Sequence, residues 1–176
     1  MMIPIHPHEP PRKLVTLAFK RSELLYDIQN YAYIEGDIKQ TDDEHQKHQV
    51  FDIVEDGNVD RVTRVLDLAF AQCVEACYPY SKTEVCNDAY ADDTLEPVDN
   101  YMLYLLVPHD MSATTINLLC KTIHELLVYK VMADWLSITK PESVATWQNK
   151  ITEHEGRVST MLNARIRRVR RTQTPF

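Results

Sequence analysis

Glycine is scarce in this chain of 176 residues, which contains only Gly36, Gly57 and Gly156. Phosphate-binding loops need several glycines close together, because a side chain at those positions would keep the backbone away from the ligand. Tightly turned β-folds also use glycine repeatedly. Three widely separated glycines therefore disfavour both kinds of structure and favour helices, in whose interior glycine is poorly tolerated.

Long apolar runs and paired cysteines are missing as well. No stretch of eighteen apolar residues could form a transmembrane helix, and Met1–His8 lacks the basic region and apolar segment of a signal peptide. We therefore expect a protein that stays in the cytoplasm of the producing cell and makes no membrane contact. Cys73, Cys77, Cys86 and Cys120 contain no Cys-x-x-Cys pair, and we expect reduced, mostly buried thiols.

No catalytic motif takes the place of these features. His45 and His48 lie three residues apart beside Glu44 in a predicted helix, which could present two zinc ligands on one face. The sequence places no third ligand near them, so a solvated polar face is the preferred interpretation. We predict that the protein is not an enzyme, with no catalytic residue, no metal and no cofactor.

Positive charge is concentrated in the last twenty residues, which carry six arginines and no acid. The rest of the chain holds 13 basic and 26 acidic residues, so a segment of +6 follows a body of −13. Such segregation indicates that one part of a molecule docks on an acidic partner. The predicted docking residues of this basic tail, residues 165–176, are Arg165, Arg167, Arg168, Arg170, Arg171 and Phe176.

Three interpretations of the tail remain open. Arginine forms bidentate pairs with carboxylates, and a terminal aromatic residue can fill a pocket on a partner, so docking on a protein is preferred. The arginines would also suit the C-terminal end of a helix dipole. Nucleic acid is the third candidate, although the acidic body would repel it over most of the surface.

Residues 79–100 form a predicted acidic loop with six acids and, after Lys82, no base. A loop of this length in a compact domain is either functional or disordered. It lacks the Asp-x-Asp-x-Asp-Gly pattern of calcium loops. We expect a surface segment that docks on another chain, for example on the basic tail of a second copy, chiefly through Asp92, Asp93 and Glu96.

The apolar spacing predicts a mainly α fold of about five helices in a bundle, with one short β-element and extended arms at both ends. Residues 1–13 are the N-terminal arm and residues 14–164 the helical domain. Ser22 and Gly36 are expected to bound the first helix, and Pro79 to end the third. The predicted helices cover 23–34, 41–55, 58–77, 113–138 and 140–169, with a strand at 101–107 and a strand or helix approach at 14–19.

Two capping boxes are expected to start helices, Thr41 with Glu44 and Thr139 with Glu142. Asp110 or Ser112 should cap the helix over 113–138, which is apolar over more than half of its circumference. Such a helix lies at the centre of a core or faces a partner. We expect it to be the most buried helix of the protein.

The region from Asn117 to Phe176 combines a long apolar helix, with Ile123-His124-Glu125-Leu126 and Trp135-Leu136, a Pro-Glu start to the next helix and an Arg-rich end. This plan resembles the head-to-tail connector proteins, which form neck or adaptor rings in tailed bacteriophages. Virion proteins of crAss-like and related phages or prophages of gut bacteria are similar. The resemblance implies a structural subunit of a homo-oligomeric ring that docks on portal, neck or tail proteins, assembled in the host cytoplasm and part of the virion. DNA would pass through without sequence-specific contact.

Two other functions compete with this one. A nucleic-acid-binding regulator would use the arginine tail as its contact with phosphates. A metal-dependent enzyme would use His45, His48 and the acidic loop. An acidic body is consistent with a ring lumen along which DNA slides, since like charges repel. Extended arms are consistent with a head-to-tail interface that closes into a ring by rotation.

Overall fold

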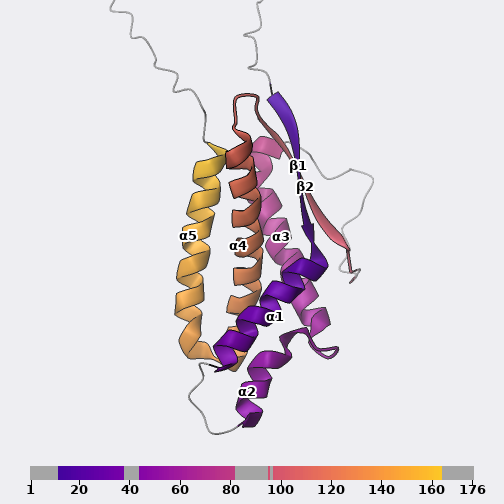
Figure 1. The fold of residues 1–176 in the computed structure, drawn as a ribbon, viewed down its shortest axis with the longest axis vertical. Coiled ribbons are helices and arrows are strands. Elements are labelled where there is room, and N and C mark those ends of the chain that lie inside the picture. The colour runs from indigo at the N-terminus through magenta and orange to yellow at the C-terminus, as the bar shows by residue number, and fades with distance from the viewer. Residues whose placement is uncertain (1–11, 38–43, 82–94, 96, 164–176) are drawn as a thin grey trace, which may run out of the picture.

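The computed structural model describes residues 12–37, 44–81, 95 and 97–163, and this part of the chain is mainly helical, as the sequence predicted. A nine-residue strand leads without a gap into the first helix (Figure 1). Two short 3-10 turns, η1 (Asp52–Val54) and η2 (Pro141–Ser143), connect helices. The other elements are β1 (Arg12–Lys20), α1 (Arg21–Asp37), α2 (Glu44–Phe51), α3 (Val59–Ser81), β2 (Asn100–Pro108), α4 (Ala113–Thr139) and α5 (Val144–Leu162).

Helix α4 is the centre of the molecule. Helices α3 and α5 flank it along their lengths, α1 crosses it at one end, and the two strands cover α3 and α4 from outside (Figure 1). More of its residues are buried than in any other described helix, which confirms the prediction for 113–138. The hydroxyl Oγ of Ser112 caps the helix, accepting a 3.0 Å hydrogen bond from the Thr115 amide.

The two strands pair antiparallel over their whole lengths, with Leu17 opposite Leu103. Their side chains alternate, and Leu17, Phe19, Leu103, Leu105 and their neighbours of the same parity face the core. The segment 101–107 is a strand as predicted, but it is not buried on both faces. Because one face of a two-stranded sheet packs on the helices, the other face stays exposed.

The first helix is longer than the sequence predicted. It begins at Arg21, so Ser22 lies inside it rather than capping it, and it continues through Gly36 to Asp37. Gly36 is buried because it lies against the ring of Phe51, where a Cβ would overlap the ring. This glycine permits a close approach of α1 and α2, and it does not end the helix.

Alanine substitutions at two glycines should have opposite effects. Gly36→Ala should lower the free energy of unfolding by about 1–3 kcal/mol, because the Phe51 ring is held by stacking on Tyr33 and cannot move aside freely. Gly156→Ala should raise it by up to about 1 kcal/mol, because Gly156 lies in the middle of α5 with open space around a Cβ. Urea denaturation of both variants measures the two changes in the free energy of unfolding. Equal effects of the two substitutions would contradict the close contact at Gly36.

Three other predicted boundaries are wrong. Pro79 lies inside α3, which runs to Ser81 because Tyr80 packs against the core and its hydroxyl donates to Asn163 Oδ1. Thr139 is the last residue of α4 and donates its hydroxyl to the Trp135 carbonyl, so it does not cap the following helix. Helix α5 begins at Val144 after η2, and Ser143 makes no side-chain cap.

The remaining element boundaries agree more closely with those predicted from the sequence. Asn58 immediately precedes α3, and its side chain donates to the carbonyl of Asp52. The second helix ends at Phe51, and the chain continues in the 3-10 turn instead of reaching Glu55 as α-helix. Thr41 and the continuation of the last helix to residue 169 lie outside the described residues.

Candidate functional site

All nine docking residues predicted from the sequence lie outside the described residues. Six belong to the basic tail and three to the acidic loop. The structure does describe the points at which these segments join the bundle. The residues concerned are Arg165, Arg167, Arg168, Arg170, Arg171, Phe176, Asp92, Asp93 and Glu96.

The two arms join the bundle at the same end. Strand β1 begins there at Arg12, and α5 ends there at Leu162 (Figure 1). Helix α3 also ends there, and the bond from the Tyr80 hydroxyl to Asn163 connects its last turn to the end of α5. We call this region the arm end. The attachment points of segments 1–11 and 164–176 are 150 residues apart in the sequence, yet both lie at this end of the bundle.

The opposite end of the bundle is acidic. There α1 ends and α3 and α5 begin, and five exposed acids lie in these short stretches. Lys140 and Arg61 lie in the same region, but the charge of Lys140 is buried against Glu35 and Arg61 is paired with Asp134. The charges of the described elements are therefore unevenly distributed along the long axis. The exposed acids are Asp37, Glu55, Asp56, Asp60 and Glu142.

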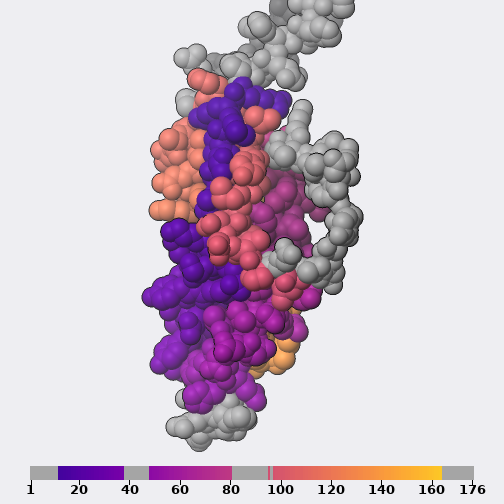
Figure 2. Space-filling model, turned by 90° about the vertical axis from the view of Figure 1, so that its right-hand side faces the viewer, coloured from indigo at the N-terminus to yellow at the C-terminus, as the bar shows by residue number. Residues whose placement is uncertain are grey.

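An apolar surface runs along the outside of the two strands. Leu14 is 65%, Tyr104 44% and Met102 40% exposed, which is unusual for large apolar side chains next to one another. Figure 2 shows this surface along the middle of the view, with no described helix in front of it. We call it the sheet face, and it consists of Leu14, Thr16, Ala18, Met102, Tyr104 and Leu106.

A cavity of about 440 Å³ lies between α3 and α5 over the middle of α4. Its lining is mainly apolar, and its charged members are already paired, since Lys130 Nζ lies 2.8 Å from Glu155 Oε1 and from Gln72 Oε1. Cys73 contributes the one thiol of the lining, and burial raises its pKa to about 12. The thiol is therefore protonated at neutral pH, so this cavity holds no activated nucleophile.

Histidines do not form a metal centre in the described part of the chain. His124 Nε2 lies 2.8 Å from Asp27 Oδ2, which connects α4 to α1 at a partly exposed position. His48 makes an edge contact with the ring of Phe51. No group of three or more His, Cys, Asp or Glu side chains within the described ranges is arranged to hold a metal ion.

The carboxylate of Glu35 accepts hydrogen bonds from three side chains. It accepts hydrogen bonds from Lys140 Nζ at 2.9 Å, Ser143 Oγ at 3.2 Å and Trp147 Nε1 at 3.0 Å. Burial acts to raise the pKa of Glu35, but these bonds and the charge of Lys140 outweigh it and hold the pKa below its ordinary value. Lys140 and Ser143 belong to the turn between α4 and α5, and Trp147 lies in the first turn of α5, so the carboxylate fastens α1 to this corner of the bundle.

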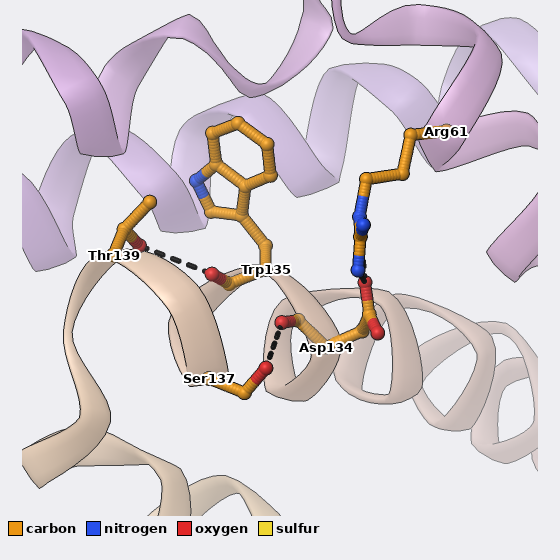
Figure 3. Close-up of polar contacts among 5 residues, drawn as sticks. All are labelled: Arg61, Asp134, Trp135, Ser137 and Thr139. Atoms are coloured by element: carbon orange, nitrogen blue, oxygen red, sulfur yellow. Dashed lines mark hydrogen bonds and ion pairs between the residues drawn. The ribbon is translucent and has the colours of Figure 1, made fainter.

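A second polar contact connects α3 with α4. Both Nε and Nη2 of Arg61 donate to Asp134 Oδ2, at 3.2 and 2.9 Å, on the surface of the bundle (Figure 3). The ring of Trp135 points away from this pair, toward the neighbouring ribbons. Its Nε1 donates a buried 3.1 Å hydrogen bond to the carbonyl of Val50. The Arg61–Asp134 pair and the Trp135 indole therefore join α4 to α3 and to α2, and each of these groups has a partner within the protein.

The described part of the chain contains three free cysteine thiols. Cys73 and Cys77 are buried free thiols and Cys120 is a half-buried one, as predicted, whereas Cys86 lies outside the described residues. None of the described helices is long and apolar enough to cross a membrane.

Sequence reasoning missed the sheet face and the Glu35 cluster. The sheet face had a signal, because the apolar residues of 14–19 and 101–107 occupy both parities of each strand. One parity suffices for packing on the helices, so the other parity indicated a second apolar surface. Glu35 had no such signal, because its partners lie 105 to 112 residues away.

No family model matches this chain, and neither does a curated protein or a solved structure.

Proposed function

We propose that this protein is a structural subunit that assembles by docking, as part of a homo-oligomeric head-tail connector ring in a bacteriophage virion. The observation that carries the proposal is the common attachment of both arms at one end of the helical bundle. Segments that leave from the same end can engage the same neighbour or the same partner ring. The proposed partners are other copies of the chain and the portal or neck proteins.

The charge distribution supports this arrangement. Five arginines follow α5 at the arm end, and the exposed acids gather at the other end of the bundle. An acidic partner surface would therefore meet the arm end, while the acidic end would repel DNA that passes along it. Neither end needs a catalytic group, and the polar groups of Glu35, Trp135 and Lys130 have partners within the protein. The protein would act through surfaces and not through chemistry.

Removing the basic tail tests the proposal. A variant ending at Asn163 should keep the helical content and unfolding midpoint of the full chain, because α5 already ends at Leu162. It should lose self-assembly or portal binding, because the arginines that pair with carboxylates are gone. Light scattering after size-exclusion chromatography measures the assembly, and circular dichroism measures the fold.

A matched variant separates the effect of positive charge from the effect of the guanidinium geometry. Replacing the five tail arginines with lysine keeps the charge but removes the planar fork, so we expect partial loss of assembly and stronger salt sensitivity. A truncated chain that assembles normally would contradict the proposal. Loss of DNA binding with unchanged assembly would instead support the nucleic-acid-binding regulator, with a salt-dependent affinity for DNA as its signature.

A further inference from the structure

The sheet face is too small to hold two bundles together by itself. Nine residues per strand and two strands give a surface of about 30 Å by 10 Å, or roughly 300 Å². Two such faces packed together would bury about 600 Å², whereas stable protein dimers bury about 1,200–2,000 Å². The dimensions match one extended segment lying along the strands.

The charges around the sheet face indicate which segment of this chain could bind there. Arg12 and Lys20 are exposed at the two ends of β1, on the same side of the strand as Leu14, and the sheet face itself carries no acid. Lys20 is paired with Glu23 at 3.0 Å, so the repulsion of the arginine-rich tail would come chiefly from Arg12. Residues 1–11 carry one acid, Glu9, and no lysine or arginine, so they are electrostatically suited to this surface.

The apolar residues of this arm have the spacing of a strand. Met1, Ile3 and Ile5 alternate with other residues, and in extended backbone alternate side chains lie on one side. Eleven extended residues span at most about 36–40 Å, which is enough to follow the sheet face from end to end. The arm therefore offers one apolar row of the right length to one apolar surface.

The prolines decide whether the arm reaches its own sheet face or that of another copy. To lie on its own sheet face, the chain would have to reverse sharply immediately before Arg12. Pro10 and Pro11 stand at that point, and each disfavours helical backbone in the residue before it. Consecutive prolines favour extended polyproline backbone, so this dipeptide favours an arm that continues away from Arg12 over one that folds back on its own sheet face.

We propose that residues 1–9 of one copy bind in extended conformation along the sheet face of a neighbouring copy, with Met1, Ile3 and Ile5 against Leu14, Met102 and Tyr104. The inference rests on the proposed function, because it names the surface through which neighbouring ring subunits engage. It makes the interface heterologous: the arm of each subunit occupies the sheet of the next.

Cysteine pairing between two different copies tests this contact. One variant carries Ile5→Cys and the other Met102→Cys, both in a background with Cys86→Ser and Cys120→Ser, so that the remaining cysteines are the buried Cys73 and Cys77. Mixed and assembled under mild oxidation, the two should form a disulfide-linked dimer. Ile138→Cys replaces Met102→Cys in the control, since Ile138 is 59% exposed but lies on α4 away from the sheet. We expect about tenfold less cross-linking in the control.

Three results would overturn the inference. Equal cross-linking to Ile138→Cys would show that the arm has no preferred surface. A disulfide within one chain, in a variant carrying both Ile5→Cys and Met102→Cys, would assign the arm to its own sheet. Efficient dimers of Met102→Cys alone would indicate direct contact between two sheet faces.

Surface substitutions separate this inference from the proposed function. Leu14→Asn and Tyr104→Ser should weaken self-assembly by on the order of tenfold or more without shifting the unfolding midpoint, because both side chains are exposed. Ile138→Asn is the matched control and should leave assembly unchanged. Normal rings from the two sheet variants would contradict the inference while the proposed function stands. A full-length chain that stays monomeric at every concentration, with or without portal protein, would contradict both.

Discussion

Replacing Trp135 with alanine should lower the free energy of unfolding by about 3–5 kcal/mol. The side chain is 8% exposed, and it packs between α4 and the segment that contains α2 and η1. Alanine would leave a cavity where the indole was and would remove the donor for the Val50 carbonyl, which lies in the buried core. Since a domain of this size is stable by about 5–15 kcal/mol, the loss would be a large fraction of the total.

Two further variants separate the contributions of packing and hydrogen bonding. Trp135→Phe keeps most of the apolar ring but loses the Nε1 donor, so we expect a smaller loss of about 1–3 kcal/mol. Ile138→Ala changes an apolar residue of the same helix that is 59% exposed, and it should change stability by no more than about 0.5 kcal/mol. Chemical denaturation at neutral pH measures all three. A loss below about 1 kcal/mol for Trp135→Ala would contradict the burial of this side chain.

Helices could be predicted from the sequence where local spacing determines them. Helix α4 has apolar residues around most of its circumference and a Ser112 cap, and both features are visible within thirty residues of sequence. The apolar stripe of α3 is similarly local, although its end was placed too early. Pro79 would stop an isolated helix, but Tyr80 gains enough by packing and by its bond to Asn163 to extend the helix by another half turn.

Contacts between distant segments could not be predicted in this way. The pairing of β1 with β2 joins residues about ninety positions apart, and nothing in either strand specifies the partner. Gly36 has the composition of a helix end, yet the ring of Phe51 makes it a point of close helix contact. Thr139 and Glu142 match a capping box in sequence, but the turn is organised by the buried pair of Lys140 and Glu35 instead.

The same distinction applies to the candidate site. Charge segregation identified the basic tail and the acidic loop, but their residues lie outside the described ranges, so their docking role stays a prediction. The common attachment of the two arms at one end depends on how β1, α3 and α5 are placed in space. Spatial placement of this kind is set by tertiary packing, which local sequence patterns do not report.

Replacing Glu35 with glutamine should lower the free energy of unfolding by roughly 3 kcal/mol at neutral pH, near the lower end of the range for breaking a buried ion pair. Lys140 Nζ would lose its charged partner while its side chain stays 8% exposed, and its remaining acceptors at position 35, an amide oxygen and the backbone carbonyl, would be neutral. The surface pair of Lys20 and Glu23, with side chains 65% and 61% exposed, provides the control. Glu23→Gln should cost no more than about 0.5 kcal/mol.

The pH dependence of the Glu35→Gln effect identifies its electrostatic origin. Because the pKa of Glu35 in the folded protein lies below its ordinary value of 4.5, folding favours the ionised carboxylate. This stabilisation is fully present above the unfolded pKa and is lost as the pH falls through the folded pKa. The difference in unfolding free energy between the native chain and Glu35→Gln should therefore be constant near neutral pH and shrink in acid. A difference that stays constant down to the lowest pH at which the protein folds would mean that packing, and not the charge of Glu35, fastens α1 to the turn between α4 and α5.

The double variant Glu35→Gln with Lys140→Met removes both charges. The stability that it recovers relative to Glu35→Gln alone would measure the cost of leaving the lysine unpaired.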